Sequence, residues 1–159
     1  MARGRDIIVT SNPKGFFDEG VINDTSKPGT VMMMDTSKAA SLWQGGNPWF
    51  IAAAYGTDGL KVVPYCLLAD AKQGKTLEDA YVAGTKIQLY CPIAGEEMNI
   101  LAGEVAGTGN SYTFNDRLIL DAESGILVPF TGSPQDTMFQ AMETVTQVAG
   151  SFLLWVVKT

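Results

Sequence analysis

The stretch that decides the fold is residues 138–158, MFQAMETVTQVAGSFLLWVVK. Two apolar segments, 138–148 and 152–157, flank a short Ala-Gly-Ser linker. The second segment is apolar on both of its alternating faces, so it predicts a strand covered on both sides, by a second layer of protein or by a partner subunit. The first also fits helical spacing, but its β-branched residues favour a strand. We therefore expect the pair to form the closing hairpin of a β-barrel or sandwich.

Length and composition agree with an all-β chain. The 159 residues suffice for one domain with a real core, and 17 glycines, 7 prolines and only 18% charged residues are typical of short strands joined by tight turns. We predict a mainly β protein with one or two short helical turns: an extended N-terminal arm over residues 1–20 and a single β-barrel domain over residues 21–159.

Charge and residue types exclude several function classes. The net charge is −6 and the 11 basic residues are scattered, which argues against nucleic-acid binding. The chain has no histidine, so the commonest general base and metal ligand is missing. No apolar run has the length of a signal peptide or membrane span. We expect a soluble, unsecreted protein without metal or cofactor.

Cysteine and carboxylate chemistry also lacks support. Cys66 and Cys91 could pair if their strands are adjacent, but buried, free and inert thiols are the expected outcome. Without histidine a thiolate has no ordinary activator, so we expect no enzyme. Glu96 and Glu97 are neighbours that point to different sides of an extended chain, so we expect a solvated turn and no acid–base pair.

A phosphate-loop interpretation of Gly74-Lys75-Thr76 fails because the glycine needed five residues earlier is Ala69. The sequence from Thr76 onward, TLEDAY, instead predicts one capped turn.

The first 20 residues hold one β-branched run, residues 7–9, and two adjacent aromatics, Phe16 and Phe17. Two interpretations stay open. The segment is a frayed terminus, or it is a tail that adds to another subunit's sheet or lies along a partner surface.

Further strands follow from turn signals. Lys27-Pro28-Gly29 predicts a type II turn before a strand that contains the methionine triplet Met32–Met34, which is most simply core or interface filler. Residues 35–43 predict a helical turn, and residues 49–54 and 60–68 predict a hairpin around an Asp-Gly turn. Strands are also expected at residues 86–91 and 98–105, and residues 117–121 and 126–130 predict a second hairpin.

The order of these features resembles the small head-decoration, or cement, proteins of tailed bacteriophages. The resemblance is carried by the turn at residues 27–30, by GTKIQLY (84–90) leading into GEEMN (95–99), by NDRL (115–118) before the second hairpin, and by FQAME (139–143) before the closing strand. It covers most of the chain after residue 20.

The resemblance implies a compact β-barrel or β-tulip domain on the outside of the mature virion head, made in the host cytoplasm and without catalytic residues. It implies binding to the major capsid protein and homotrimers at local threefold positions, which stabilise the coat against DNA pressure. Excess apolar surface suits such a role. We take these residues as the candidate capsid or subunit interface: Arg3, Arg5, Ile7, Phe16, Phe17, Met32, Met34, Trp43, Trp49, Leu153, Trp155 and Val157.

The main alternative is a carbohydrate-binding β-sandwich module on a virion or cell surface. In that interpretation Trp43, Trp49 and Tyr55 form a platform that stacks on a sugar.

Overall fold

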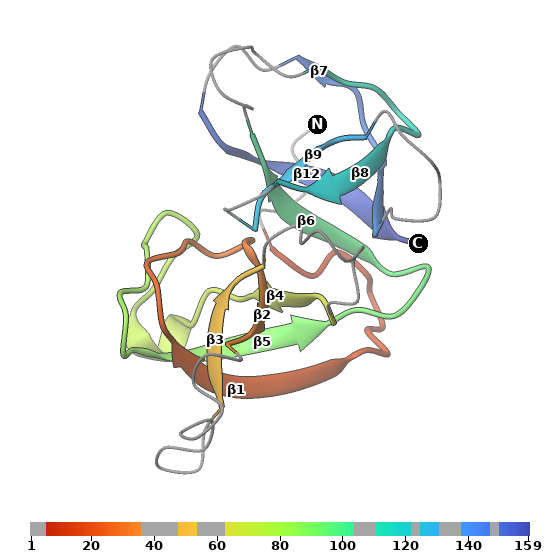
Figure 1. Cartoon of the computed structure of the whole chain (residues 1–159). Helices are drawn as coiled ribbons and strands as arrows, with labels where there is room; N and C mark the ends of the chain where they lie inside the picture. Colours follow the sequence, from red (N-terminus) through yellow and green to blue (C-terminus); the bar gives the residue numbers. More distant parts are fainter. Residues whose placement is uncertain are drawn as a thin grey trace.

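The computed structural model describes residues 6–35, 48–53, 63–103, 111–121, 125–130, 138–146 and 150–159, and it confirms an all-β fold (Figure 1). Its strands close into two barrels, one above the other in Figure 1, with a separate two-stranded sheet. The elements in chain order are β1 (Phe16–Ile22), β2 (Val31–Met34), β3 (Trp49–Ala52), β4 (Tyr65–Leu67), the 3-10 helix η2 (Ala71–Gln73), β5 (Lys86–Cys91), β6 (Glu97–Ala102), β7 (Ser111–Tyr112), β8 (Arg117–Leu120), β9 (Leu127–Pro129), β10 (Phe139–Ala141), β11 (Val145–Thr146) and β12 (Phe152–Lys158).

The first barrel has the strand order β1-β3-β2-β4-β5 and closes through β1. On one side β1 pairs antiparallel with β5 over six residues, from Phe16 opposite Cys91 to Val21 opposite Lys86, and on the other it pairs parallel with β3. The alternation of β5 explains its place: Ile87, Leu89 and Cys91 all face the barrel interior.

The second barrel, ordered β10-β12-β6-β9-β8, is tied to the rest of the chain by β6. One edge of β6 pairs with β12 along its whole length. Along the other edge the Asn99 amide donates to the Ile7 carbonyl (2.8 Å), the Leu101 amide donates to the Gly29 carbonyl (2.9 Å), and Ala102 pairs with β9. Three distant segments therefore share one edge of β6.

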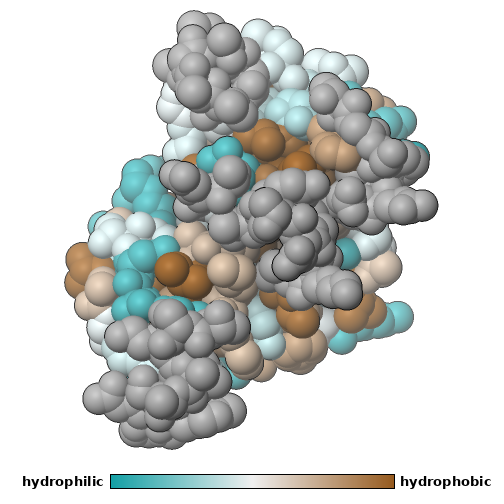
Figure 2. All heavy atoms as spheres, in the orientation of Figure 1, coloured by the Kyte–Doolittle hydropathy of each residue, from teal (hydrophilic) through white to brown (hydrophobic). Residues whose placement is uncertain are grey.

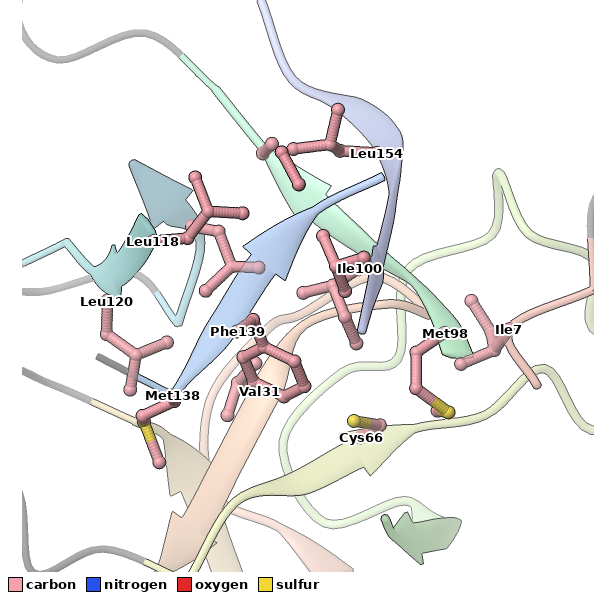
Figure 3. Close-up of a cluster of buried hydrophobic side chains, with 14 of the residues drawn as sticks. Ile7, Val31, Cys66, Met98, Ile100, Leu118, Leu120, Met138, Phe139 and Leu154 are labelled. Atoms are coloured by element: carbon pink, nitrogen blue, oxygen red, sulfur yellow. The ribbon is translucent and has the colours of Figure 1, made fainter. Parts of the chain in front are cut away.

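Two apolar clusters fill the molecule. One occupies the first barrel and includes Phe50 and Tyr81. The other fills the second barrel and also includes Val31, Cys66 and Tyr90 from strands of the first barrel. Figure 3 shows Val31 beside Phe139 and Cys66 near Met98. Because one core joins both barrels, we expect them to unfold together.

Several predicted strands are confirmed, among them β2 after the Gly29 turn (φ 89°), β5, β6 and the β8–β9 hairpin with Gly125 at φ 63°. The turn led by Thr76 is also present, since the Thr76 amide and hydroxyl both donate to the Asp79 carboxylate (2.8 and 2.7 Å).

The closing pair is antiparallel as expected, with Phe139 opposite Lys158. The prediction of one long strand over residues 138–148 is wrong, however. The chain turns after Ala141, and Val145 pairs with Tyr112 of β7 instead of continuing along β12. A local apolar pattern does not reveal this change of partner.

The hairpin expected from residues 49–54 and 60–68 is also wrong in its pairing. Strands β3 and β4 both pair with β2, which lies between them. The Asp-Gly turn itself and most of the helical turn expected at residues 35–43 lie outside the described residues.

The described part of the N-terminal segment pairs with both barrels of its own chain. Residues 16–20 belong to β1 of the first barrel, and residues 7–9 pair with β6, with Ile8 opposite Met98. The Val9 amide donates to the Glu97 carbonyl (3.0 Å). Within the described residues from Asp6 onward, this segment is extended and bound to its own chain.

Candidate interaction surface at the mouth of the first barrel

One open end of the first barrel is rimmed by exposed hydrophobic side chains. At this end β1 and β4 begin and β2 and β5 end, because Phe16 pairs with Cys91 and Met32 with Tyr65. The rim residues and their exposed fractions are Phe16 (50%), Met34 (38%), Val63 (53%) and Ile93 (44%). Brown hydrophobic surface lies at the lower right of Figure 2, near the ends of β1 and β5 in Figure 1.

Aromatic rings pack against both Phe16 and Phe17 at this rim. The Phe16 ring meets the Tyr65 ring edge to face (5.9 Å between centroids), and Tyr65 meets Phe50 in the same way (5.1 Å). Burial, and then the nearby Asp18 carboxylate, raise the pKa of Tyr65. Phe17, 62% exposed, lies on the outer face of β1 against Tyr90 (4.9 Å). The rim rests on packed rings, so its shape is fixed by the core.

A buried carboxylate, Glu96, fixes both sides of the rim. Its Oε1 accepts hydrogen bonds from the Lys14 amide and the Gly15 amide (3.1 Å), next to Phe16. Its Oε2 accepts from the Tyr90 hydroxyl (2.7 Å) and the Ile93 amide (2.9 Å). One side chain therefore joins the segment before β1 to the segment after β5.

The ionisation of Glu96 follows from this environment. Burial alone would raise the pKa of its carboxyl, but the hydrogen bonds that it accepts outweigh burial and hold the pKa below its usual range. On the partner side, burial and then the hydrogen bond to Glu96 raise the pKa of Tyr90 to about 12. Glu96 is thus a carboxylate at neutral pH and Tyr90 is its neutral donor.

Gly15 permits this close arrangement. A Cβ atom there would lie 2.1 Å from the Cys91 carbonyl oxygen and 2.7 Å from the Tyr90 ring, closer than side chains approach. The bare backbone lets the Gly15 amide reach both the Tyr90 hydroxyl (2.8 Å) and Glu96. Glycine at this position therefore sets where Phe16 begins the strand.

The prediction of a solvated turn at Glu96 and Glu97 is wrong. Glu96 is only 5% exposed, and Glu97 accepts a hydrogen bond from the Trp155 indole (2.9 Å). The two carboxylates do point to different sides, and each serves a different contact within the chain.

The outer face of β12 is partly covered by the chain's own first barrel. Leu153, Trp155 and Val157 are half-buried, while Leu154 and Val156 are fully buried on the other face. A Cβ added at Gly29 would lie 2.7 Å from a methyl carbon of Leu153, so the Gly29 turn packs directly on this face. The second layer expected over this strand is therefore supplied in part by the turn before β2.

The remaining candidate residues are dispersed. Ile7 is buried in the shared core and Met32 in the first barrel, so neither is available to a partner, contrary to the prediction. Trp49 is half-buried at the start of β3. Arg3, Arg5, Trp43 and Tyr55 lie outside the described residues, and so does most of the predicted sugar platform.

Of the predicted candidates, Phe16 and Met34 lie on the rim and Phe17 lies beside it, whereas Val63 and Ile93 were not predicted. Each of these lies beside a proline, Val63 before Pro64 and Ile93 after Pro92, and no local pattern marks either as part of a rim. Only the register of β4 and β5 brings them to the same barrel end.

The described residues offer few groups for catalysis or for metal binding. Both cysteines are buried and free, as predicted, and burial raises the pKa of each thiol. No cluster of three histidine, cysteine or carboxylate residues there could hold a metal ion. No helix among the described residues is long and apolar enough to cross a membrane.

The fold places the chain among all-β proteins built from two small closed barrels. No protein-family model and no curated protein matches the sequence. Among solved structures, the chain is similar to the N base of the head fiber gp8.5 of bacteriophage phi29, with a TM-score of 0.56 and 14% identity over 91% of this chain and 94% of that one. The sequence-based resemblance to phage head proteins is thus confirmed at the level of the fold.

Proposed function

We propose that this chain is a structural protein of a tailed-phage head that binds the outer surface of the capsid and stabilises the coat lattice. The observation that carries the proposal is the shared fold with a phage head-fiber base over nearly the full length of both chains. The chain's own sequence pattern points to the same class. We expect no enzymatic activity.

The barrel mouth is the surface that we assign to the capsid. Its rim residues Phe16, Met34, Val63 and Ile93 are exposed and apolar, and Phe17 lies beside them on the outer face of β1. A soluble protein that exposes such residues together gains by covering them with a partner. The Glu96 hydrogen bonds hold the two sides of the mouth in place before binding, which lowers the entropy lost on association.

The major capsid protein is the partner that this proposal requires. We infer further that three copies bind at local threefold positions, as the resemblance to decoration proteins implies. Three linked contacts of modest strength would then hold firmly, because each bound copy raises the effective concentration of the next.

The test is co-sedimentation of the purified protein with expanded heads and with unexpanded procapsids of its virus. We expect saturable binding to expanded heads at a fixed ratio to coat subunits. The double variant Phe16→Ser/Ile93→Ser should bind at least tenfold more weakly. Phe114→Ser is the matched control, since Phe114 is equally exposed (51%) but precedes β8 of the second barrel.

Two outcomes would refute the proposal at different levels. Absence of saturable binding to either particle would remove the capsid function. Equal weakening by the Phe114 control and the mouth variant would leave the capsid function standing but remove the mouth as its surface.

A further inference from the structure

A groove of about 640 Å³ lies between the N-terminal segment around Ile8 and the first barrel, away from the mouth rim. Asp6 and Ile8 line it from the N-terminal segment, and Leu68 and Ala69 line it from the segment after β4. The turn after η2 adds Leu77 and Glu78. The proposed capsid contact does not use this groove.

Both walls of the groove have backbone N–H and C=O groups without a partner among the described residues. Ile7 directs its carbonyl at β6, and Val9 directs its amide at β6. The intervening Ile8 therefore turns its N–H and C=O away from β6. Neither of these Ile8 groups is bonded to another described residue, and the same holds for the backbone groups of Ala69. Each wall therefore presents one residue whose backbone N–H and C=O have no partner among the described residues, as the edge of a sheet does.

Two residues further along β6, at Leu101, the chain itself fills the corresponding space between β6 and β4. There the Gly29 carbonyl accepts from the Leu101 amide (2.9 Å), and the Gly29 amide donates to the Leu67 carbonyl (2.8 Å). The turn residue Gly29 (φ 89°) thus connects β6 to β4. At the groove, by contrast, the segment around Ile8 bonds to β6 but leaves a gap before Leu68 and Ala69. An extended segment placed in this gap could bond to Ile8 on one side and to Ala69 on the other.

The side chains of the groove define what such a segment should carry. Ile8, Leu68 and Leu77 are half-buried and pack on the shared core, which gives the groove an apolar floor. The charged side chains among the lining residues are both acidic, Asp6 and Glu78. Apolar side chains directed inward and basic side chains directed at the two carboxylates would match this lining.

We propose that the groove binds an extended segment of a partner protein, with alternating apolar and basic residues, by strand addition to Ile8 and Ala69. Main-chain hydrogen bonds would supply affinity, and the apolar floor and acidic rim would select the side chains. The proposal goes beyond capsid attachment through the mouth and holds or fails independently of it, because its test uses no capsid.

The test measures binding of the fluorescein-labelled, end-capped peptide Val-Lys-Val-Lys-Val to the full chain by fluorescence anisotropy. We expect saturable binding that weakens with salt. The same peptide N-methylated at its central valine should bind at least tenfold more weakly, because it loses a main-chain donor. The peptide Val-Glu-Val-Glu-Val should show the same loss.

Protein variants locate the site. Asp6→Lys/Glu78→Lys should weaken binding at least tenfold with an unchanged urea midpoint, while Glu19→Lys, an exposed charge reversal on β1, should not. Equal affinity for the N-methylated peptide, or equal loss in the Glu19 control, would overturn the proposal. So would a tenfold gain in affinity on deleting residues 2–5, which would make the chain's own N-terminus the occupant. Self-association abolished by Asp6→Lys/Glu78→Lys would make a second copy the occupant and would equally overturn the proposal.

Discussion

Replacing Glu96 by glutamine tests the link between the buried carboxylate and the barrel mouth. The carboxylate accepts four hydrogen bonds, from the amides of Lys14, Gly15 and Ile93 and from the Tyr90 hydroxyl. The amide of glutamine keeps one acceptor oxygen and directs an NH₂ group at two donors. Bonds to a charged group contribute about 1.5–3 kcal/mol each, and the neutral side chain recovers part of the desolvation cost, so we expect a net loss of about 2–3 kcal/mol.

The assay is urea unfolding at pH 7, followed by a melting curve. For a chain of this size the loss corresponds to a decrease in Tm of about 5–10 °C. Glu19→Gln, an exposed carboxylate on β1, is the control and should change stability by less than about 0.5 kcal/mol. A Glu96→Gln loss no larger than that of the control would refute the assigned role of the carboxylate.

The difference in stability between wild type and Glu96→Gln should change with pH in one direction only. The pKa of Glu96 is lower in the folded chain than in the unfolded chain, so ionised Glu96 contributes stability above the unfolded value of about 4.3. This contribution is lost as the pH falls from that value through the folded pKa. The stability difference between wild type and Glu96→Gln should therefore be constant from pH 6 to 7 and shrink below about pH 4. A difference that is the same at pH 3 and pH 7 would contradict the argument.

Three further predictions rest on packing. Gly15→Ala should destabilise the fold by about 1–3 kcal/mol in urea unfolding, because the added methyl meets the Cys91 carbonyl, and a neutral result would mean that this close approach is not real. Phe139→Ala should cost about 3–5 kcal/mol while the urea transition stays single, since Phe139 is fully buried in the core that joins both barrels; two separate transitions would show independent barrels. Iodoacetamide at pH 8 should leave Cys66 and Cys91 unmodified in the folded protein and modify both in 6 M urea, because burial raises the pKa of both thiols; rapid labelling without urea would disprove their burial.

Local patterns in the sequence were sufficient to predict the fold class and many of its strands. The alternation in residues 86–91 specifies β5, and Pro28-Gly29 specifies the turn before β2, because φ preferences and side-chain alternation act over a few residues. The two-faced apolar pattern of residues 152–157 likewise predicts a covered strand. The sequence could not decide whether a second layer of protein or a partner subunit covers this strand, because the sequence of one strand does not specify which segments pack against it.

Pairing between distant strands was decided by the tertiary structure alone. The strand β2 lies between β3 and β4 although β3 and β4 are neighbours in sequence, and β11 leaves the β10–β12 pair for β7. These choices depend on which apolar faces meet across the whole chain, so no short window contains them.

The candidate surface, too, was predicted only in part from the sequence. The sequence by itself determined an all-β chain with few charges, no histidine and two adjacent aromatics, Phe16 and Phe17. Only the tertiary structure added Val63 and Ile93 to the rim, removed Ile7 and Met32 into the core, and turned Glu96 from a supposed surface residue into a buried anchor. The physical reason is that composition and alternation act locally, whereas burial and hydrogen-bond partners are set by residues brought together across 80 or more positions of the chain.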